Sequence, residues 1–186
     1  FFATSMNSIS STFTGNVPLF SKVYFPRLIV PIVRVLVALA TLALNALMFV
    51  GFWLFYRYFT EASLPPATRM LWFLPILGYT AVLGLAMGLL LASMTIKYRD
   101  MQFFLPFFSQ LWMYATPIIY PASTVPAQWR WVIQYNPMSW TVEATRWALV
   151  GKGTFAAPEV WASAGITSLL LLLGLKNGVV DAMRQR

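Results

Sequence analysis

The stretch LIVPIVRVLVALATLALNALMFVGFWLFYRYF, from Leu28 to Phe59, decides the class of fold. A helix needs about 20 mostly apolar residues to cross the hydrocarbon core of a bilayer, and this stretch is longer than that. Its few polar side chains include Arg34 near the start and Asn45. It lacks the period-2 alternation that is typical of strands in a membrane barrel. The stretch therefore predicts a membrane-spanning helix.

Further apolar stretches extend the same pattern along the chain. Residues 1–15 are rich in Ser and Thr and are interpreted as the end of another spanning helix, although a polar surface segment fits them equally. The sequence thus predicts an all-α membrane protein: a polytopic bundle of transmembrane helices in one domain, 1–186, with five spans when the partial one is counted. The complete spans are predicted at about residues 28–56, 70–96, 101–120 and 157–176.

The composition agrees with a lipid solvent. The chain is 59% hydrophobic and 10% charged, whereas a typical soluble domain is about 25% charged. A soluble domain of this size has too little interior to hide so much apolar surface. The net charge of +8 is interpreted as cations that flank the spans and meet anionic headgroups, because no basic stripe for nucleic acid is present.

The residue inventory argues against covalent chemistry. The chain has no Cys and no His, which removes Cys nucleophiles, the usual zinc ligands and the common near-neutral proton shuttle. We therefore predict no catalytic residue, no metal site and no cofactor. The sequence Gly151-Lys152-Gly153-Thr154 resembles the tail of a phosphate-binding loop, but Arg146 stands where that loop needs Gly. Any ATP, with its Mg²⁺, is thus expected to bind a partner subunit.

The long connection at 121–152 is predicted to hold short re-entrant or interfacial helices between the last two spans. It contains several prolines, and Trp129, Trp131 and Trp147 suit the membrane interface, where an apolar ring with a polar N–H is stable. Glu143 and Arg146 are three residues apart, so on a helix they are expected to pair.

Other motifs leave alternatives open. Gly84 and Gly88, one helical turn apart, permit close approach of another helix, within the chain or in a dimer. Arg34 lies inside its span and either extends to the headgroups or faces a polar pathway. The turn at 97–100 either anchors the topology or docks a cytosolic subunit.

The distribution of cations predicts an orientation. Eight of the 13 Lys and Arg residues fall on one side of an alternating arrangement, and the other five on the opposite side. Because cytoplasmic loops carry the excess of Lys and Arg, the first side is predicted to be cytoplasmic and the segment 121–152 to face outward. The first side holds Lys22, Arg27, Arg34, Lys97, Arg99, Lys176, Arg184 and Arg186.

Several motifs in order resemble one family. They are KVYFPRLIVP at 22–31, YRD at 98–100, FFSQLWMYATPIIYP at 107–121, VP at 125–126, Trp129, NPM at 136–138 and the Glu143/Arg146 pair. Across about residues 16–151 the set resembles the membrane subunit (permease) of ABC-2-type exporters, in the branch that exports polysaccharides such as O-antigen, capsule and teichoic acid. Compared with that family, the sequence is expected to be truncated at its N-terminus, and residues 176–186 differ from the usual family tail.

The resemblance implies a function and a set of roles. It implies a multi-pass protein of the bacterial cytoplasmic membrane that works as a dimer, binds cytosolic ABC ATPase subunits and moves a lipid-linked polysaccharide outward. The loop at 16–27 would face the ATPase, residues 101–120 would line the pathway, and residues 121–152 would form outward gate helices. The residues expected to couple to the ATPase are Lys22, Tyr24, Phe25, Arg27, Tyr98, Arg99 and Asp100. Those expected along the pathway are Arg34, Phe107, Gln110, Trp112, Tyr114, Thr116 and Tyr120. Those expected at the gate are Trp129, Trp131, Asn136, Glu143 and Arg146.

Two other functions stay open at this point. An ABC-2 exporter of a drug or a lipid would use the same architecture. An intramembrane enzyme is a more remote alternative, since it would need converging acids or a nucleophile beside a base.

Overall fold

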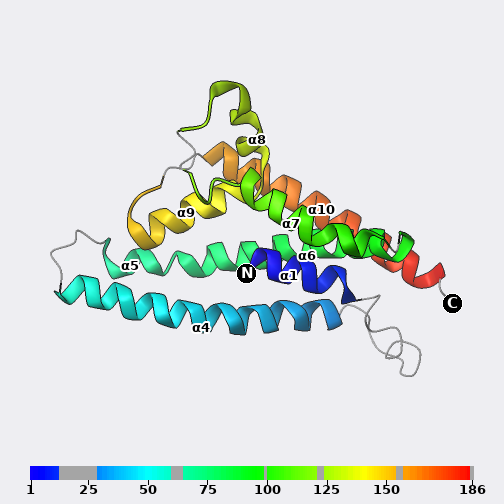
Figure 1. The fold of residues 1–186 in the computed structure, drawn as a ribbon, viewed down its shortest axis with the longest axis horizontal. Coiled ribbons are helices and arrows are strands. Elements are labelled where there is room, and N and C mark those ends of the chain that lie inside the picture. Colours follow the sequence, from blue (N-terminus) through cyan, green and yellow to red (C-terminus); the bar gives the residue numbers. More distant parts are fainter. Residues whose placement is uncertain (13–28, 60–64, 99, 121–123, 154–156, 185–186) are drawn as a thin grey trace.

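The computed structural model describes residues 1–12, 29–59, 65–98, 100–120, 124–153 and 157–184. Over these ranges the chain forms helices and no strand, which confirms the all-α class (Figure 1). The α-helices are α1 (Phe2–Ser10), α4 (Ile29–Phe59), α5 (Ala67–Met70), α6 (Phe73–Lys97), α7 (Met101–Ala115), α8 (Arg130–Tyr135), α9 (Ser139–Val150) and α10 (Ala157–Arg184), with a 3-10 helix, η2, at Ala127–Trp129.

Three of the described helices are long and apolar enough to cross a bilayer. They cover Ile29–Phe59, Thr68–Lys97 and Ala157–Asn177, and each coincides with a predicted span. The protein is therefore an all-α membrane protein. The remaining predicted span, at 101–120, contains the shorter helix α7, which ends at Ala115. Its passage through the bilayer stays a prediction.

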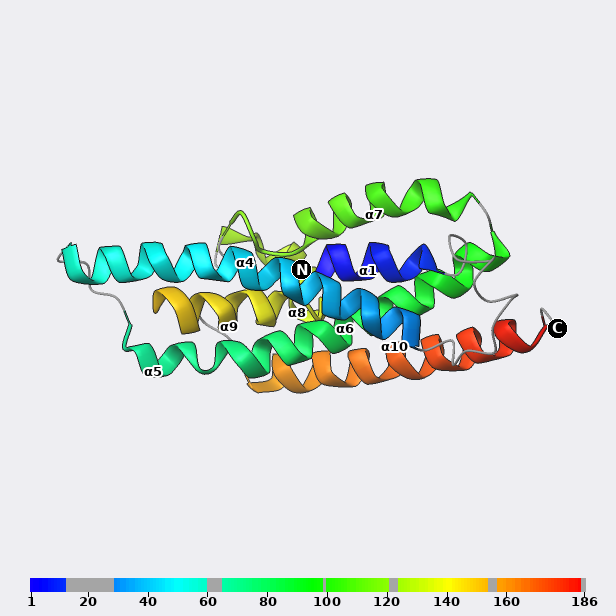
Figure 2. The ribbon, with the colours of Figure 1, turned by 90° about the horizontal axis from the view of Figure 1, so that it is seen from below.

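Helix α6 is the centre of the bundle. It packs along α10 and α1, and α1 also contacts α4 and α7. Met6 of α1 and Leu83 and Met87 of α6 share one buried cluster with Leu105 of α7. The view from below shows α1 lying between α4 and α7 (Figure 2). By contrast, α4 buries few of its residues, so most of its apolar surface is open to lipid or to another chain.

The glycine pair of α6 sets the distance between α1 and α6. A Cβ atom placed on Gly88 would lie 2.7 Å from Cβ of Ile9, and one on Gly84 would lie 3.2 Å from Cβ of Ser5. In a membrane such small residues let two helices approach and gain van der Waals contact. The close approach that the sequence indicated is therefore made with α1 of the same chain.

The segment between α7 and α10 folds into η2, α8 and α9, in line with the short helices expected there. Gly151 ends α9 with a positive φ of 76°, a conformation that favours glycine after a helix. A Cβ on Gly151 would lie 3.5 Å from Pro65, which places the end of α9 beside the start of α5. Whether these helices enter the membrane stays a prediction.

The helix directions place several of the described cations at the two ends of the bundle. In Figure 1, α4 begins at the end of the bundle where α6 and α10 finish, so Arg34, Lys97 and Lys176 belong to one end. Arg57 lies in the last turn of α4 and Arg69 in α5, both at the opposite end. The side of the membrane that each end faces stays a prediction.

Candidate functional site

Helix α7 carries most of the predicted pathway residues, and one of its faces packs inside the bundle. Leu105 is buried, and the hydroxyl of Ser109 donates a 2.8 Å hydrogen bond to the side-chain oxygen of Asn7 on α1. The ring of Trp112 lies 6.3 Å from that of Phe2 and 5.5 Å from that of Phe108. This face therefore fixes α7 against α1, and Trp112 contributes to that packing.

The opposite face of α7 is open. Phe107 is 56% exposed and Tyr114 is 53% exposed, and Gln110 between them is exposed as well. Their spacing of three and four residues places them on one side of the helix. We call Phe107, Gln110 and Tyr114 the open face of α7. Aromatic rings beside an amide offer a sugar chain flat apolar contact and exchangeable hydrogen bonds.

The end of α7 is capped by a side chain from the predicted gate. Nδ2 of Asn136 donates to the backbone oxygen of Ala115 at 3.2 Å and to Oγ1 of Thr116 at 3.0 Å. Oδ1 of Asn136 accepts a 3.0 Å hydrogen bond from the backbone N–H of Met138. The last carbonyls of a helix lack partners inside the helix, so this amide satisfies one of them. The predicted pathway residue Thr116 is buried in this contact.

A second contact joins α9 to the segment that follows α7. Arg146 pairs with Glu143 at 2.8 Å, as the spacing predicted, and its other terminal nitrogen donates to the backbone oxygen of Ile118 at 2.6 Å. Glu143 is only 7% exposed, so its charge depends on this partner. We call Asn136, Glu143 and Arg146 the clamp. The clamp joins the end of the predicted pathway helix to two of the predicted gate elements.

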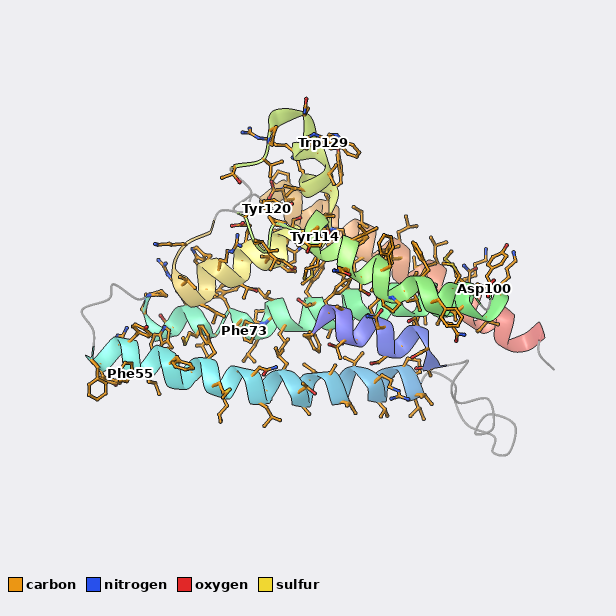
Figure 3. The ribbon with its side chains drawn as sticks, in the orientation of Figure 1. Phe55, Phe73, Asp100, Tyr114, Tyr120 and Trp129 are labelled. Atoms are coloured by element: carbon orange, nitrogen blue, oxygen red, sulfur yellow. The ribbon has the colours of Figure 1, made fainter. Side chains whose placement is uncertain are left out.

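Tyr120 lies directly after the segment that the clamp holds, and its side chain folds back on α7. Its hydroxyl donates a 2.9 Å hydrogen bond to the backbone oxygen of Tyr114 (Figure 3). The predicted pathway residues between 107 and 116 thus divide into two groups. Phe107, Gln110 and Tyr114 form the open face, whereas Trp112 is half-buried against α1 and Thr116 is buried.

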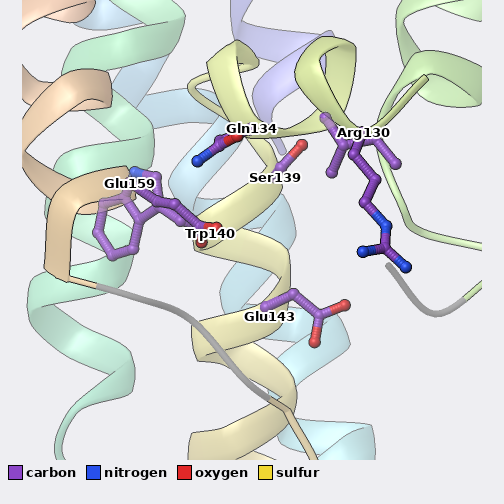
Figure 4. A pocket seen from close by; sticks show the side chains of 7 residues that line it. Arg130, Gln134, Ser139, Trp140, Glu143 and Glu159 are labelled. Atoms are coloured by element: carbon purple, nitrogen blue, oxygen red, sulfur yellow. The ribbon is translucent and has the colours of Figure 1, made fainter. Parts of the chain in front are cut away.

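A cavity of about 220 Å³ lies beside the clamp. Figure 4 shows Arg130 and Gln134 of α8 above it, Trp140 and Glu143 of α9 along it, and Glu159 from the start of α10. Trp140 rests edge-on against Tyr79 of α6, with 4.7 Å between the ring centroids. Among the described residues no group of three metal-ligating side chains occurs. The cavity is a recess under α8 that polar and apolar side chains line together.

Sequence reasoning missed the polar contacts that join α6 to α10. The hydroxyl of Tyr79 lies 2.9 Å from Oγ of Ser163 and 2.6 Å from Oγ1 of Thr167. Ser163 and Thr167 are four residues apart in an apolar stretch, a spacing that puts both hydroxyls on one helix face. That spacing was the signal in the sequence that could have predicted a polar contact with another helix.

The remaining predicted residues lie elsewhere. Tyr98 and Asp100 are exposed at the junction of α6 and α7, with the ammonium of Lys97 5.3 Å from the centroid of the Tyr98 ring. Arg34 is exposed on α4. Trp129 and Trp131 are exposed, and Figure 3 shows Trp129 at the tip of the segment that projects from the bundle. The predicted coupling residues Lys22, Tyr24, Phe25, Arg27 and Arg99 lie outside the described residues.

Comparison with known proteins identifies the family. The O-antigen export system permease protein RfbA of Klebsiella pneumoniae is 24% identical over 139 residues, which are 74% of this chain and 51% of that protein. A protein of the same name in Myxococcus xanthus is 26% identical over 124 residues, which are 67% of this chain and 45% of that protein. The chain spans about half the length of the curated relatives it matches. Residues 1–150 match the ABC-2 type transporter family, and the chain therefore belongs to that family.

Proposed function

We propose that this chain is part of the membrane-spanning subunit of an ABC exporter that moves a lipid-linked polysaccharide across the bacterial cytoplasmic membrane. Two similar proteins are named as O-antigen export permeases, which favours a glycan over a drug or a free lipid. The observation on this chain that carries the proposal is the open face of α7, where Phe107, Gln110 and Tyr114 lie in a row.

The chemistry of the open face suits a polymer that must keep moving. A sugar ring has apolar C–H faces that rest on aromatic side chains, and hydroxyls that exchange hydrogen bonds with an amide. A row of exposed groups holds each sugar unit weakly, whereas an enclosed pocket would retain it. In the proposed dimer, the open faces of two copies would line one pathway.

The energy for transport would come from a partner. In this proposal a cytosolic ABC ATPase binds and hydrolyses ATP with Mg²⁺, and the subunit itself needs no cofactor. The exposed pair Tyr98 and Asp100 lies directly before α7, so a subunit that pushes on this turn would move the pathway helix. The clamp would carry that movement to α8 and α9, the proposed outward gate.

Transport in cells tests the proposal. The full-length gene is deleted, and the lipid-linked glycan is then measured inside the cell and at its surface. We expect glycan to accumulate inside, and a gene copy that carries Gln110→Ala and Tyr114→Ala to restore export less well than the wild type. The conservative change Leu111→Met on the same helix is the matched control.

Other results would select a different function. If the deletion leaves the surface glycan intact and alters resistance to a drug or the distribution of a lipid, the glycan proposal fails. If the purified protein binds no ATPase subunit, the proposal of a powered exporter fails.

A further inference from the structure

An apolar groove of about 450 Å³ runs between α4 and α6. One wall comes from α4, through Leu42, Asn45, Ala46, Phe49 and Val50. Phe73 and Leu74 of α6 form part of the other wall, and Leu149 of α9 also lines the groove. Both α4 and α6 are among the helices long and apolar enough to span the bilayer, so the groove lies at membrane depth. It belongs to neither the open face of α7 nor the clamp.

Two cations stand at one end of this groove. Arg57 follows Phe49 by eight residues on α4, about 12 Å further along the same side of the helix. Arg69 directly precedes Met70, which also lines the groove. Because α4 ends and α5 begins at this end of the bundle, both cations are placed beyond the same mouth (Figure 1).

Each cation rests on an indole ring. The guanidinium carbon of Arg57 lies 5.1 Å from the ring centroid of Trp53, and that of Arg69 lies 5.1 Å from the ring centroid of Trp147. A guanidinium on an aromatic face keeps N–H groups free to bind an anion. Within the described part of the chain, neither arginine forms an ion pair with a carboxylate. Trp72, three residues after Arg69, is exposed, and exposed Trp side chains are enriched at membrane interfaces.

We propose that this groove binds an anionic phospholipid of the bilayer, with an acyl chain between α4 and α6 and the phosphate between Arg57 and Arg69. The groove offers apolar contact along its length, and its mouth offers two positive charges at headgroup level. The apolar groove matches the acyl chain of a phospholipid, and the cationic mouth matches its phosphate. The site goes beyond the proposed export function, because it does not depend on what the pathway carries.

Lipid retention tests the site directly. The full-length protein is purified in detergent and given equal amounts of phosphatidylglycerol and phosphatidylcholine with identical acyl chains, and bound lipid is counted by native mass spectrometry. We expect phosphatidylglycerol to be preferred, and the preference to fall about fivefold for each cation removed by Arg57→Gln and Arg69→Gln. Lys97→Gln is the matched control, since Lys97 also lies over an aromatic ring but at the opposite end of α6. It should leave the preference unchanged.

A second variant tests the groove itself. Ala46→Phe places a ring in the apolar wall, and we expect it to lower retention of both lipids without changing the preference between them. The proposal is overturned if the double arginine variant keeps the wild-type preference, or if Lys97→Gln lowers the preference equally. It is also overturned if a photoreactive group at position 46 crosslinks to protein, such as a second copy of the chain, instead of lipid.

Discussion

The guanidinium of Arg146 donates a 2.6 Å hydrogen bond to the backbone oxygen of Ile118, twenty-eight residues earlier in the chain. The same side chain pairs with the carboxylate of Glu143 one helical turn away. A motif in α9 therefore holds the irregular segment that follows α7. Through these two contacts, the Glu143 and Arg146 pair and the segment after Ala115 form one structural unit.

Removing Arg146 should weaken the clamp. In Arg146→Ala, Glu143 remains nearly buried without a cation and the oxygen of Ile118 loses its donor. We expect the free energy of unfolding to fall by about 1–3 kcal/mol. Glu143→Gln should cost less, because its side-chain oxygen still accepts a hydrogen bond from Arg146. Thermal unfolding in detergent, followed by tryptophan fluorescence, measures the change.

A matched control separates the clamp from a general effect of charge. Arg130 is exposed on α8 and its Nε donates a 3.3 Å hydrogen bond to the backbone oxygen of Val125. Arg130→Ala should lower the melting temperature less than Arg146→Ala does. An equal fall in melting temperature for the two variants would show that the contact with Ile118 adds no stability beyond that of an exposed arginine.

Asn136 should control the order of the segment after α7. Asn136→Asp removes the Nδ2 donor and places a carboxylate oxygen opposite the backbone oxygen of Ala115, so repulsion replaces the hydrogen bond. We expect amide hydrogen exchange over residues 115–120 to rise about tenfold or more in this variant, and to rise in Asn136→Ala as well. Gln134→Ala, which removes an exposed amide of α8, should leave the exchange over these residues unchanged. Unchanged protection in both Asn136 variants would contradict the capping role.

The long helices were predictable because each is determined by the apolar residues of its own stretch of sequence. A long apolar stretch such as Leu28 to Phe59 must form a helix in lipid, since its backbone polar groups find no other partners there. The end of α7 was harder to place, because the apolar pattern continues to Tyr120. The helix ends at Ala115, and Thr116 turns to an extended conformation with ψ of 139°. Pro117 accounts for this, because a proline disfavours the helical conformation in the residue before it.

The contacts between distant segments were not predictable from the sequence. Gly84 and Gly88 indicated that some helix comes close to α6, but composition alone does not name α1 as that helix. Likewise, the motif around Gln110 indicated a functional helix without showing which of its residues face outward. Trp112 and Tyr114 differ in exposure because α1 covers one side of α7, and this covering depends on the whole bundle.

Adding a methyl group to Gly88 should separate α1 from α6. The new Cβ would lie 2.7 Å from Cβ of Ile9, which forces the two backbones apart, and overpacking of this kind costs about 1–3 kcal/mol. Gly84→Ala should cost less, because its nearest neighbour is 3.2 Å away. Gly51→Ala on α4 is the control, since no atom lies within 4 Å of its Cβ position. Thermal unfolding that ranks the three variants in another order would contradict this packing.

The open face of α7 should be reachable from water in the assembled transporter. Residues 1–186 contain no cysteine, so a single cysteine introduced at Phe107, Gln110 or Tyr114 is the only thiol in this part of the protein. A charged thiol reagent that does not enter the bilayer core should modify all three, because the proposed translocation pathway for sugars would be hydrated. Cysteines at Leu105 and Ser109, on the face packed against α1, should resist the reagent. If the three outward positions also resist it in membranes, while detergent-denatured protein reacts fully, then this face contacts lipid and the pathway lies elsewhere.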